Sequence, residues 1–148
     1  MRVIAQNKRA RHELEVLDRI EAGIVLLGSE VKSLRAGQLE LVDAYLRIDG
    51  SEAFLLKARI PPYDHGGYAN HEPTRKRKLL LHRREIQRLR ARIEQKGLTV
   101  VPLKVYFNDH GKVKVELGIG RGRKAFDKRQ SIKKRELDRQ AKRAMRDG

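Results

Sequence analysis

Hydrophobic and polar positions alternate with a period of two in several short stretches of this chain. Such alternation is typical of β-strands that bury one face. The stretches that alternate, or that run apolar without a break, are residues 14–20, 24–27, 44–48, 53–58, 99–107 and 112–119. Two turns, Asp49-Gly50-Ser51 and Asn108-Asp109-His110-Gly111, join the last four stretches into pairs. Because these turn residues tolerate positive φ, we predict two β-hairpins.

Two other segments show helical periodicity instead. In residues 29–36 the apolar positions share one helix face, with Ser29 as the expected N-cap and Gly37 as the stop. Residues 83–96 carry an apolar stripe opposite an arginine-rich face and are followed by Gly97. The pattern therefore predicts two short helices among the strands.

Six or so antiparallel strands with short flanking helices predict a mainly β protein. The pattern resembles a small closed antiparallel barrel of the oligonucleotide-binding (OB) type, which has no free sheet edges and leaves one face for RNA. This pattern stops after Gly118, Gly120 and Gly122. We therefore assign residues 1–120 to an OB-like RNA-binding barrel and residues 121–148 to a basic C-terminal tail.

Charge changes this picture most in the tail. Residues 121–148 hold 12 Lys and Arg against 4 Asp and Glu, which is +8, or half of the formal +16 of the chain. So basic a segment cannot bury enough apolar surface to offset its ordering entropy, so we expect disorder until a ribosome binds it. Nine more Lys and Arg lie between Arg75 and Arg92, beside the single acid Glu85. The two basic zones predict two nucleic-acid contacts, although a charge run can also serve solubility alone.

Composition also bounds the compartment and the partners. The chain has no cysteine, which excludes a disulfide framework and thiolate metal sites and fits a reducing compartment. No stretch approaches the ~20 apolar residues of a membrane span, and residues 1–11 lack the apolar core of a signal peptide. We therefore expect a cytoplasmic protein without a membrane partner.

Candidate catalytic and metal-binding residues are few. His65 and His71 share a loop with two acids, but without the ligand spacing of known metal motifs, so we interpret this segment as a polar loop. Glu13 and Glu15 could hold Mg²⁺, yet on a basic surface they more simply balance charge. The run Gly118 to Lys124 lacks the spacing and the Ser or Thr of a P-loop, so we interpret it as a flexible, RNA-contacting hinge. We predict no catalytic residue, no metal and no cofactor.

Two residues suggest contacts with bases rather than phosphates. Glu30 lies beside Lys32 and Arg35 on the first predicted helix, where its carboxylate could accept hydrogen bonds from base edges. The alternative for Glu30 is an ion pair with Arg35 or a neighbour. Phe126, isolated among basic residues, could stack on a base or pack back onto the barrel.

Ordered sequence blocks run along nearly the whole chain. They are Asn7-Lys8-Arg9-Ala10, Glu21-Ala22-Gly23-Ile24, GSEVKSLR at 28–35, Asp43 with Tyr45, HEPTR at 71–75, RKLLLH at 77–82, residues 97–102, and GRKAFDKR at 122–129. In these blocks the chain resembles the bacterial SsrA-binding proteins, also called small protein B. Phe126 departs from the family pattern, which often has Tyr or His there, so a hydrogen bond at this position is lost while a stacking plane remains.

The resemblance implies a non-enzymatic ribosome-rescue factor that works as a monomer in a ribonucleoprotein complex. The barrel would bind the tRNA-like domain of transfer-messenger RNA and deliver it to stalled ribosomes in trans-translation, and the tail would enter the decoding site and the empty mRNA channel. Implied contacts with transfer-messenger RNA are Asn7, Lys8, Glu30, Lys32, Arg35, Lys114 and Lys124. Implied ribosome contacts in the tail are Phe126, Asp127, Lys128, Arg129, Lys133 and Lys134.

Two other functions stay open from the residues alone. A constitutive ribosomal or general RNA-binding protein would share the barrel and the basic charge, and would lose affinity on truncation in proportion to the phosphates lost, about 0.9 of salt slope each. A metal-dependent RNA-processing enzyme would cleave RNA in the presence of Mg²⁺ or Mn²⁺.

Overall fold

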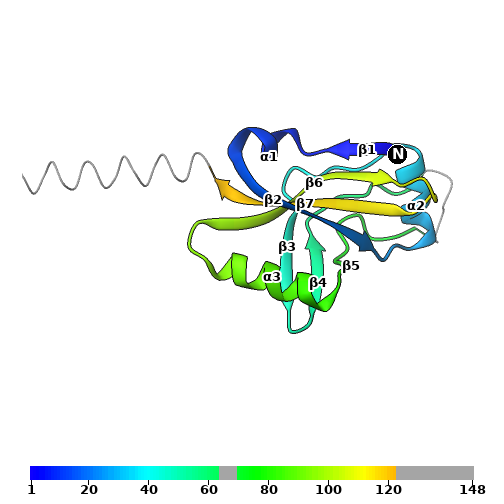
Figure 1. Ribbon diagram of the computed structural model, residues 1–148. Helices are drawn as coiled ribbons and strands as arrows, with labels where there is room; N and C mark the ends of the chain where they lie inside the picture. Colours follow the sequence, from blue (N-terminus) through cyan, green and yellow to red (C-terminus); the bar gives the residue numbers. More distant parts are fainter. Residues whose placement is uncertain (64–69, 123–148) are drawn as a thin grey trace, which may run out of the picture.

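The computed structural model describes residues 1–63 and 70–122 (Figure 1). The predicted tail contacts, Lys124 included, therefore lie outside the described residues, as does His65. Within the described part, no helix is long and apolar enough to cross a membrane.

Seven strands form one antiparallel sheet in the order β1-β6-β7-β2-β5-β4-β3. The strands are β1 (Arg2–Gln6), β2 (Leu14–Ile24), β3 (Tyr45–Asp49), β4 (Glu52–Leu56), β5 (Arg77–Leu80), β6 (Leu98–Phe107) and β7 (Val113–Gly122). The helices are α1 (Lys8–Glu13), α2 (Gly28–Arg35) and α3 (Arg83–Glu94). The prediction of a mainly β protein with short helices is confirmed.

The predicted closure of the sheet into a barrel is not found. The edge strands of the sheet are β1 and β3, and no ladder joins them in the described part of the chain. The sheet curls far enough for β3 to pack against β6 without pairing with it. A closed barrel needs a matched tilt and register stagger around the whole sheet, and the two edge strands are only five residues long each.

Both predicted hairpins are confirmed. Asp49 pairs with Glu52, so Gly50 and Ser51 form a two-residue loop, in which Gly50 has a φ of 61°. At the second turn the side-chain oxygen of Asn108 accepts hydrogen bonds from the backbone amides of His110 and Lys112, at 3.0 and 2.9 Å. Local turn chemistry thus sets the register of both hairpins.

The second predicted strand, at residues 24–27, is wrong. Residues 14–24 form a single long strand, and Val25 and Leu27 are exposed after the chain leaves the sheet. The N-cap of α2 is Leu27 rather than Ser29, because the carboxylate of Glu30 accepts a hydrogen bond from the Leu27 amide at 2.7 Å. The hydroxyl of Ser29 lies 2.9 Å from Nδ1 of the buried His71 instead.

The glycine-rich end of β7 is packed strand and not a flexible hinge. Gly118 and Gly120 are buried, and the strand continues to Gly122, two residues past the predicted domain boundary. A Cβ on Gly120 would lie 2.2 Å from the carbonyl oxygen of Glu15 on β2. The glycines are therefore needed for the close approach of β2 and β7.

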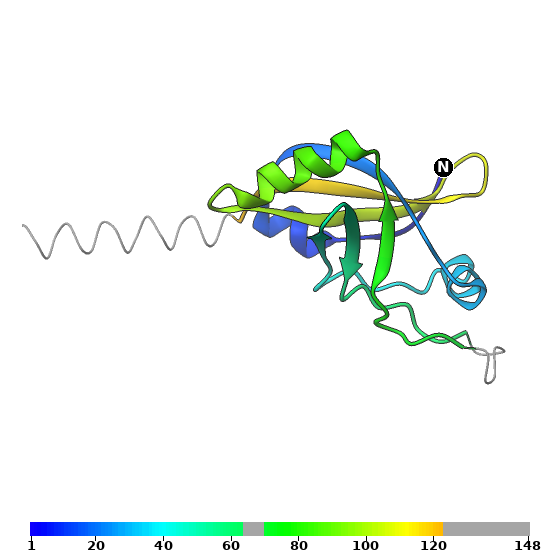
Figure 2. The same cartoon turned by 90° about the horizontal axis from the view of Figure 1, so that it is seen from below.

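The core lies between the inner face of the sheet and α3 (Figure 2). Ile86 and Leu89 of α3 pack against sheet residues such as Ile20 and Leu117. The predicted helix at 83–96 is confirmed except for its last two residues, and Gly97 follows at a φ of 85°. The sequence pattern missed β1 and α1, because β1 has no fully buried position and α1 buries no residue.

Candidate nucleic-acid interface

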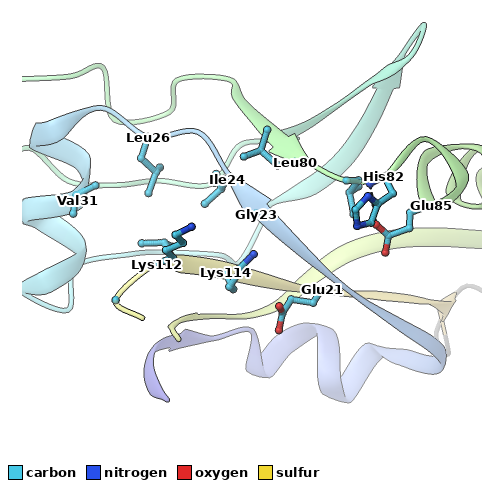
Figure 3. A pocket seen from close by; sticks show the side chains of 13 residues that line it. Glu21, Gly23, Ile24, Leu26, Val31, Leu80, His82, Glu85, Lys112 and Lys114 are labelled. Atoms are coloured by element: carbon cyan, nitrogen blue, oxygen red, sulfur yellow. Dashed lines mark hydrogen bonds between the residues drawn. The ribbon is translucent and has the colours of Figure 1, made fainter. Parts of the chain in front are cut away.

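An open groove of about 770 Å³ lies where the end of β2, the end of β5, the start of α3 and the β6–β7 turn meet (Figure 3). Its apolar lining residues are Ile24, Leu26, Val31, Leu80, Leu81 and Val113. Its polar lining residues are Glu21, His82, Glu85, Lys112 and Lys114. Leu80 is 53% exposed, so the groove presents an apolar surface to solvent next to charged groups. Such a mixture suits a ligand with both flat apolar faces and negative charge, as nucleic acids have.

Two lysines lie on one side of the groove. Lys114 belongs to β7, where its neighbours across the ladders are Gly23 of β2 and Tyr106 of β6. Lys112 is exposed at the end of the β6–β7 turn. Neither ammonium group takes part in an ion pair within residues 1–63 and 70–122, whereas Lys104 on β6 is held by Glu116 at 3.1 Å. Both groove lysines are therefore available to neutralise phosphates.

Glu21 places a carboxylate in the same groove. The hydroxyl of the buried Tyr106 donates a hydrogen bond to Oε2 of Glu21. Burial, together with the negative charges of Glu21 and Glu116, raises the pKa of Tyr106, so the phenol stays a donor at neutral pH. This bond fixes the orientation of Glu21 and leaves its second oxygen as an acceptor facing the groove. The sequence analysis noted Glu21 only within a sequence block, although its place on the polar side of the β2 alternation pointed outward.

Glu30 has an internal role, so its predicted contact with base edges is wrong. Its side chain is fully buried. Oε1 lies 2.6 Å from Nη2 of Arg75, and Oε2 lies 2.6 Å from Nε of Arg77. Burial alone would raise the pKa of Glu30, but the hydrogen bonds from Arg75, the Leu27 amide and Arg77 outweigh it and lower that pKa. The ion-pair alternative was the better one, with Arg75 and Arg77 as the partners instead of Arg35.

The Glu30 cluster supports one wall of the groove. Nη2 of Arg75 also lies 3.4 Å from the carbonyl oxygen of Val25, in the segment that joins β2 to α2. Arg77 donates further hydrogen bonds to the carbonyl oxygens of Ala58 and Pro73, at 2.7 and 3.0 Å. Glu30 thus orients the two arginines that tie this segment to the β4–β5 connection.

Asn7 also lies inside the protein, so its predicted RNA contact is wrong as well. Its side-chain oxygen accepts a hydrogen bond from the Ala10 amide and caps α1. Its side-chain amide donates to the carbonyl oxygens of Leu41 and Pro102, at 3.1 Å each. These bonds fix α1 to the rest of the fold and leave Asn7 only 4% exposed.

The remaining predicted contacts are distributed around the molecule. Lys114 lines the groove, and Lys32 and Arg35 are exposed on α2, which borders the groove through Val31. Lys8 is exposed on α1, at the end of β2 far from the groove. The structure therefore brings three of the seven predicted residues to one side and leaves Lys8 elsewhere.

The buried His71 takes part in internal hydrogen bonds. Its Nε2 lies 2.8 Å from the carbonyl oxygen of Ile60, and its Nδ1 contacts the Ser29 hydroxyl. In the described part of the chain, no three His, Asp or Glu side chains gather in a way that could hold a metal ion. His71 therefore acts as a link between α2 and the loop after β4.

Comparison with known proteins gives a consistent set of matches. The family model described as SmpB protein matches residues 4–147. The SsrA-binding protein of Oleidesulfovibrio alaskensis is 56% identical over 141 residues, covering 95% of this chain and 90% of the relative. The SsrA-binding protein of Thermus thermophilus is 52% identical over 134 residues, covering 90% and 93% of the two chains. A solved structure described as "tmRNA-SmpB: a journey to the center of the bacterial ribosome" is 53% identical with a TM-score of 0.69, covering 80% of this chain and 82% of that one.

Proposed function

Because this chain belongs to the SmpB family of SsrA-binding proteins, we propose that it binds transfer-messenger RNA and delivers it to stalled ribosomes in trans-translation. It is an RNA-binding protein and not an enzyme. Its partners are transfer-messenger RNA and the bacterial ribosome, and its place of action is the cytoplasm, where stalled ribosomes are found.

The groove between β2, β5, α3 and the β6–β7 turn is the proposed site for the tRNA-like domain. The observation that carries this assignment is the Glu21 carboxylate, held by Tyr106 beside two unpaired lysines, Lys112 and Lys114. The lysines supply phosphate attraction, which does not depend on sequence, and the carboxylate supplies an acceptor that only a correctly placed donor satisfies. Leu80 supplies an apolar surface for a base or a ribose.

The curled sheet is proposed to act as a partly open barrel of the OB type. OB-folds are five-stranded, partly open barrels, and the contact of β3 with β6 supports this assignment. We retain the division into an RNA-binding body and a basic tail, with the boundary moved to Gly122, where β7 ends.

The tail is proposed to recognise the stalled ribosome. Its charge of +8 over residues 121–148 suits ribosomal RNA, and a channel filled by messenger RNA would exclude it. Phe126 would stack in the decoding centre, and Lys124 would extend the contact with transfer-messenger RNA. The further proposed ribosome contacts are Asp127, Lys128, Arg129, Lys133 and Lys134.

Competition binding tests the RNA assignment. Full-length protein is bound to the labelled tRNA-like domain at near-physiological salt, and ordinary tRNA or unstructured RNA is added in excess. We expect the tRNA-like domain to remain bound. Equal competition by all three RNAs would instead indicate a general RNA-binding protein, which is the alternative that the basic charge alone allows.

A truncation separates the body from the tail. Ending the chain after Gly122 keeps β7 whole, whereas ending it after Gly120 would remove the pairs Leu14–Gly122 and Glu15–Arg121. The protein that ends at Gly122 should still bind the tRNA-like domain and should fail to support tagging on stalled ribosomes. Full activity of this truncated protein on ribosomes would overturn the proposed role of the tail.

A further inference from the structure

Helix α3 exposes arginines that the fold does not use. Ile86 and Leu89 face the core, while Arg83, Arg84 and Arg90 are exposed. In the described part of the chain, none of these three guanidinium groups has an ion pair or a side-chain hydrogen bond. Only Arg88 among the α3 arginines is paired, with Asp18 of β2. By contrast, most arginines elsewhere in the sheet region have carboxylate partners, for example Arg47 with Asp49 and Arg59 with Glu40.

The positions of these arginines are unfavourable for the helix itself. Arg83 and Arg84 are the first two residues of α3, where the positive end of the helix dipole disfavours cations. The one acid of this turn, Glu85, is engaged in capping, because it accepts a hydrogen bond from the His82 amide at 2.9 Å. Arg84 and Arg88 are also spaced four apart, which brings like charges together on one face. A violation of local rules without structural gain is typical of a functional surface.

The arginines continue directly from the groove. His82 and Glu85 line the groove, and Arg83 and Arg84 lie between them in the sequence. Arg90 lies seven residues after Arg83, or roughly 10 Å further along the helix axis. Figure 2 shows α3 running from the end of β5 toward the start of β6, away from the groove.

We propose that Arg83, Arg84 and Arg90 bind phosphates of the RNA strand that leaves the groove, so that α3 extends the RNA interface by about three phosphates. This inference rests on the proposed function, and the partner is the backbone of the same tRNA-like RNA. Guanidinium groups suit this role because they bind phosphate oxygens with two parallel hydrogen bonds. The contact is independent of sequence, so it adds affinity and orientation, while Glu21 in the groove adds selectivity.

A pair of matched double variants tests the proposal. Arg84→Gln with Arg90→Gln removes two unpaired exposed charges, and Arg47→Gln with Arg59→Gln removes two paired exposed charges. Binding of the tRNA-like domain is measured over a range of salt concentrations. The first double variant should lower the log–log salt slope by about 1.8 and weaken binding roughly tenfold or more at moderate salt. The second should change neither quantity, and equal losses in both would show that only total charge matters.

A third double variant, Lys112→Gln with Lys114→Gln, keeps this proposal distinguishable from the proposed function. If it weakens binding while the α3 variant does not, the α3 contact is overturned and the groove assignment stands. If it has no effect, the groove assignment fails. If the α3 variant weakens only ribosome binding, with unchanged affinity for the tRNA-like domain, the helix contacts a different RNA and our proposal is overturned.

A charge reversal separates function from structure. Arg84→Glu places an acid at the second position of α3, four residues before Arg88, where both the helix dipole and the Arg88 charge favour it. The urea midpoint of unfolding should therefore stay the same or rise, while affinity for the tRNA-like domain falls by more than in Arg84→Gln. A lower urea midpoint would mean that Arg84 serves the fold, and the phosphate role would then be withdrawn.

Discussion

Glu30 and Glu21 both accept hydrogen bonds that join distant parts of the chain, but Glu30 does so in the interior and Glu21 does so at the groove. Glu30 is surrounded by Arg75, Arg77 and the Leu27 amide, which together use both of its oxygens. Glu21 has the Tyr106 hydroxyl on one oxygen only. The difference teaches that unused acceptor capacity at an accessible site, and not the presence of nearby cations, marks a carboxylate that can read a ligand.

The largest effect should come from breaking the interior site. Glu30→Gln removes the charge between Arg75 and Arg77 and leaves Arg77 buried without a counterion. Breaking a buried pair in this way destabilises proteins by about 3–5 kcal/mol. Urea unfolding should show that loss, while Glu21→Gln, as the matched control, should change the free energy of unfolding by less than about 1 kcal/mol. Equal losses in the two variants would end the distinction between them.

Acid should remove part of the same stabilisation. The folded-state pKa of Glu30 lies below its ordinary value of 4.5, so its contribution to stability is complete above that value and is lost as the pH falls through the folded-state pKa. The difference in unfolding free energy between the natural protein and Glu30→Gln should therefore be constant from neutral pH to about pH 5 and shrink below it. A difference that grows on acidification would contradict the assigned direction.

A smaller effect, on RNA binding alone, is expected at Glu21. Glu21→Gln keeps an oxygen for Tyr106 but replaces the free acceptor at the groove with an amide donor. Affinity for the tRNA-like domain should fall by about 1–3 kcal/mol, the usual penalty for an unpaired buried group. Competition binding against ordinary tRNA should show the loss as reduced preference. If removing this negative charge tightens binding, attraction of phosphates alone explains the affinity.

The smallest effect should come from a single groove lysine. Lys112→Gln should reduce the salt slope of binding by about 0.9, the value for one phosphate contact. Lys78→Gln is the matched control, because Lys78 is equally exposed on β5 but lies 3.9 Å from Glu52. Salt titrations of both variants with the tRNA-like domain measure the contrast. Identical slopes would remove Lys112 from the proposed phosphate contacts.

Elements with strong local signals were predictable from the sequence. The two hairpins depend on turn residues such as Gly50 and Asn108, and α3 depends on its own apolar stripe. Elements without such signals were missed, as α1 was, because it buries no residue. Whether the sheet closed could not be predicted, because it depends on the geometry of all seven strands together.

The candidate site was less predictable than the fold. Lys114 was expected on the RNA face from its alternation on a strand, and it lines the groove. Asn7 and Glu30 carry polar side chains in basic surroundings and resembled surface residues, yet both are buried. The glycines near residue 120 resembled a hinge, because sequence alone cannot show that Glu15 of β2 lies against Gly120.

By itself, the sequence determined the basic charge, the hairpins, the long helix and the family, because each depends on residue identity or on neighbours a few positions apart. Only the tertiary structure decided which glutamate faces the groove and which lies inside. That choice depends on partners far along the chain: Arg75 and Arg77 reach Glu30 from 45 and 47 residues away, and Tyr106 reaches Glu21 from 85. Burial and the pairing of charges are properties of the folded surface, so no local pattern could have assigned them.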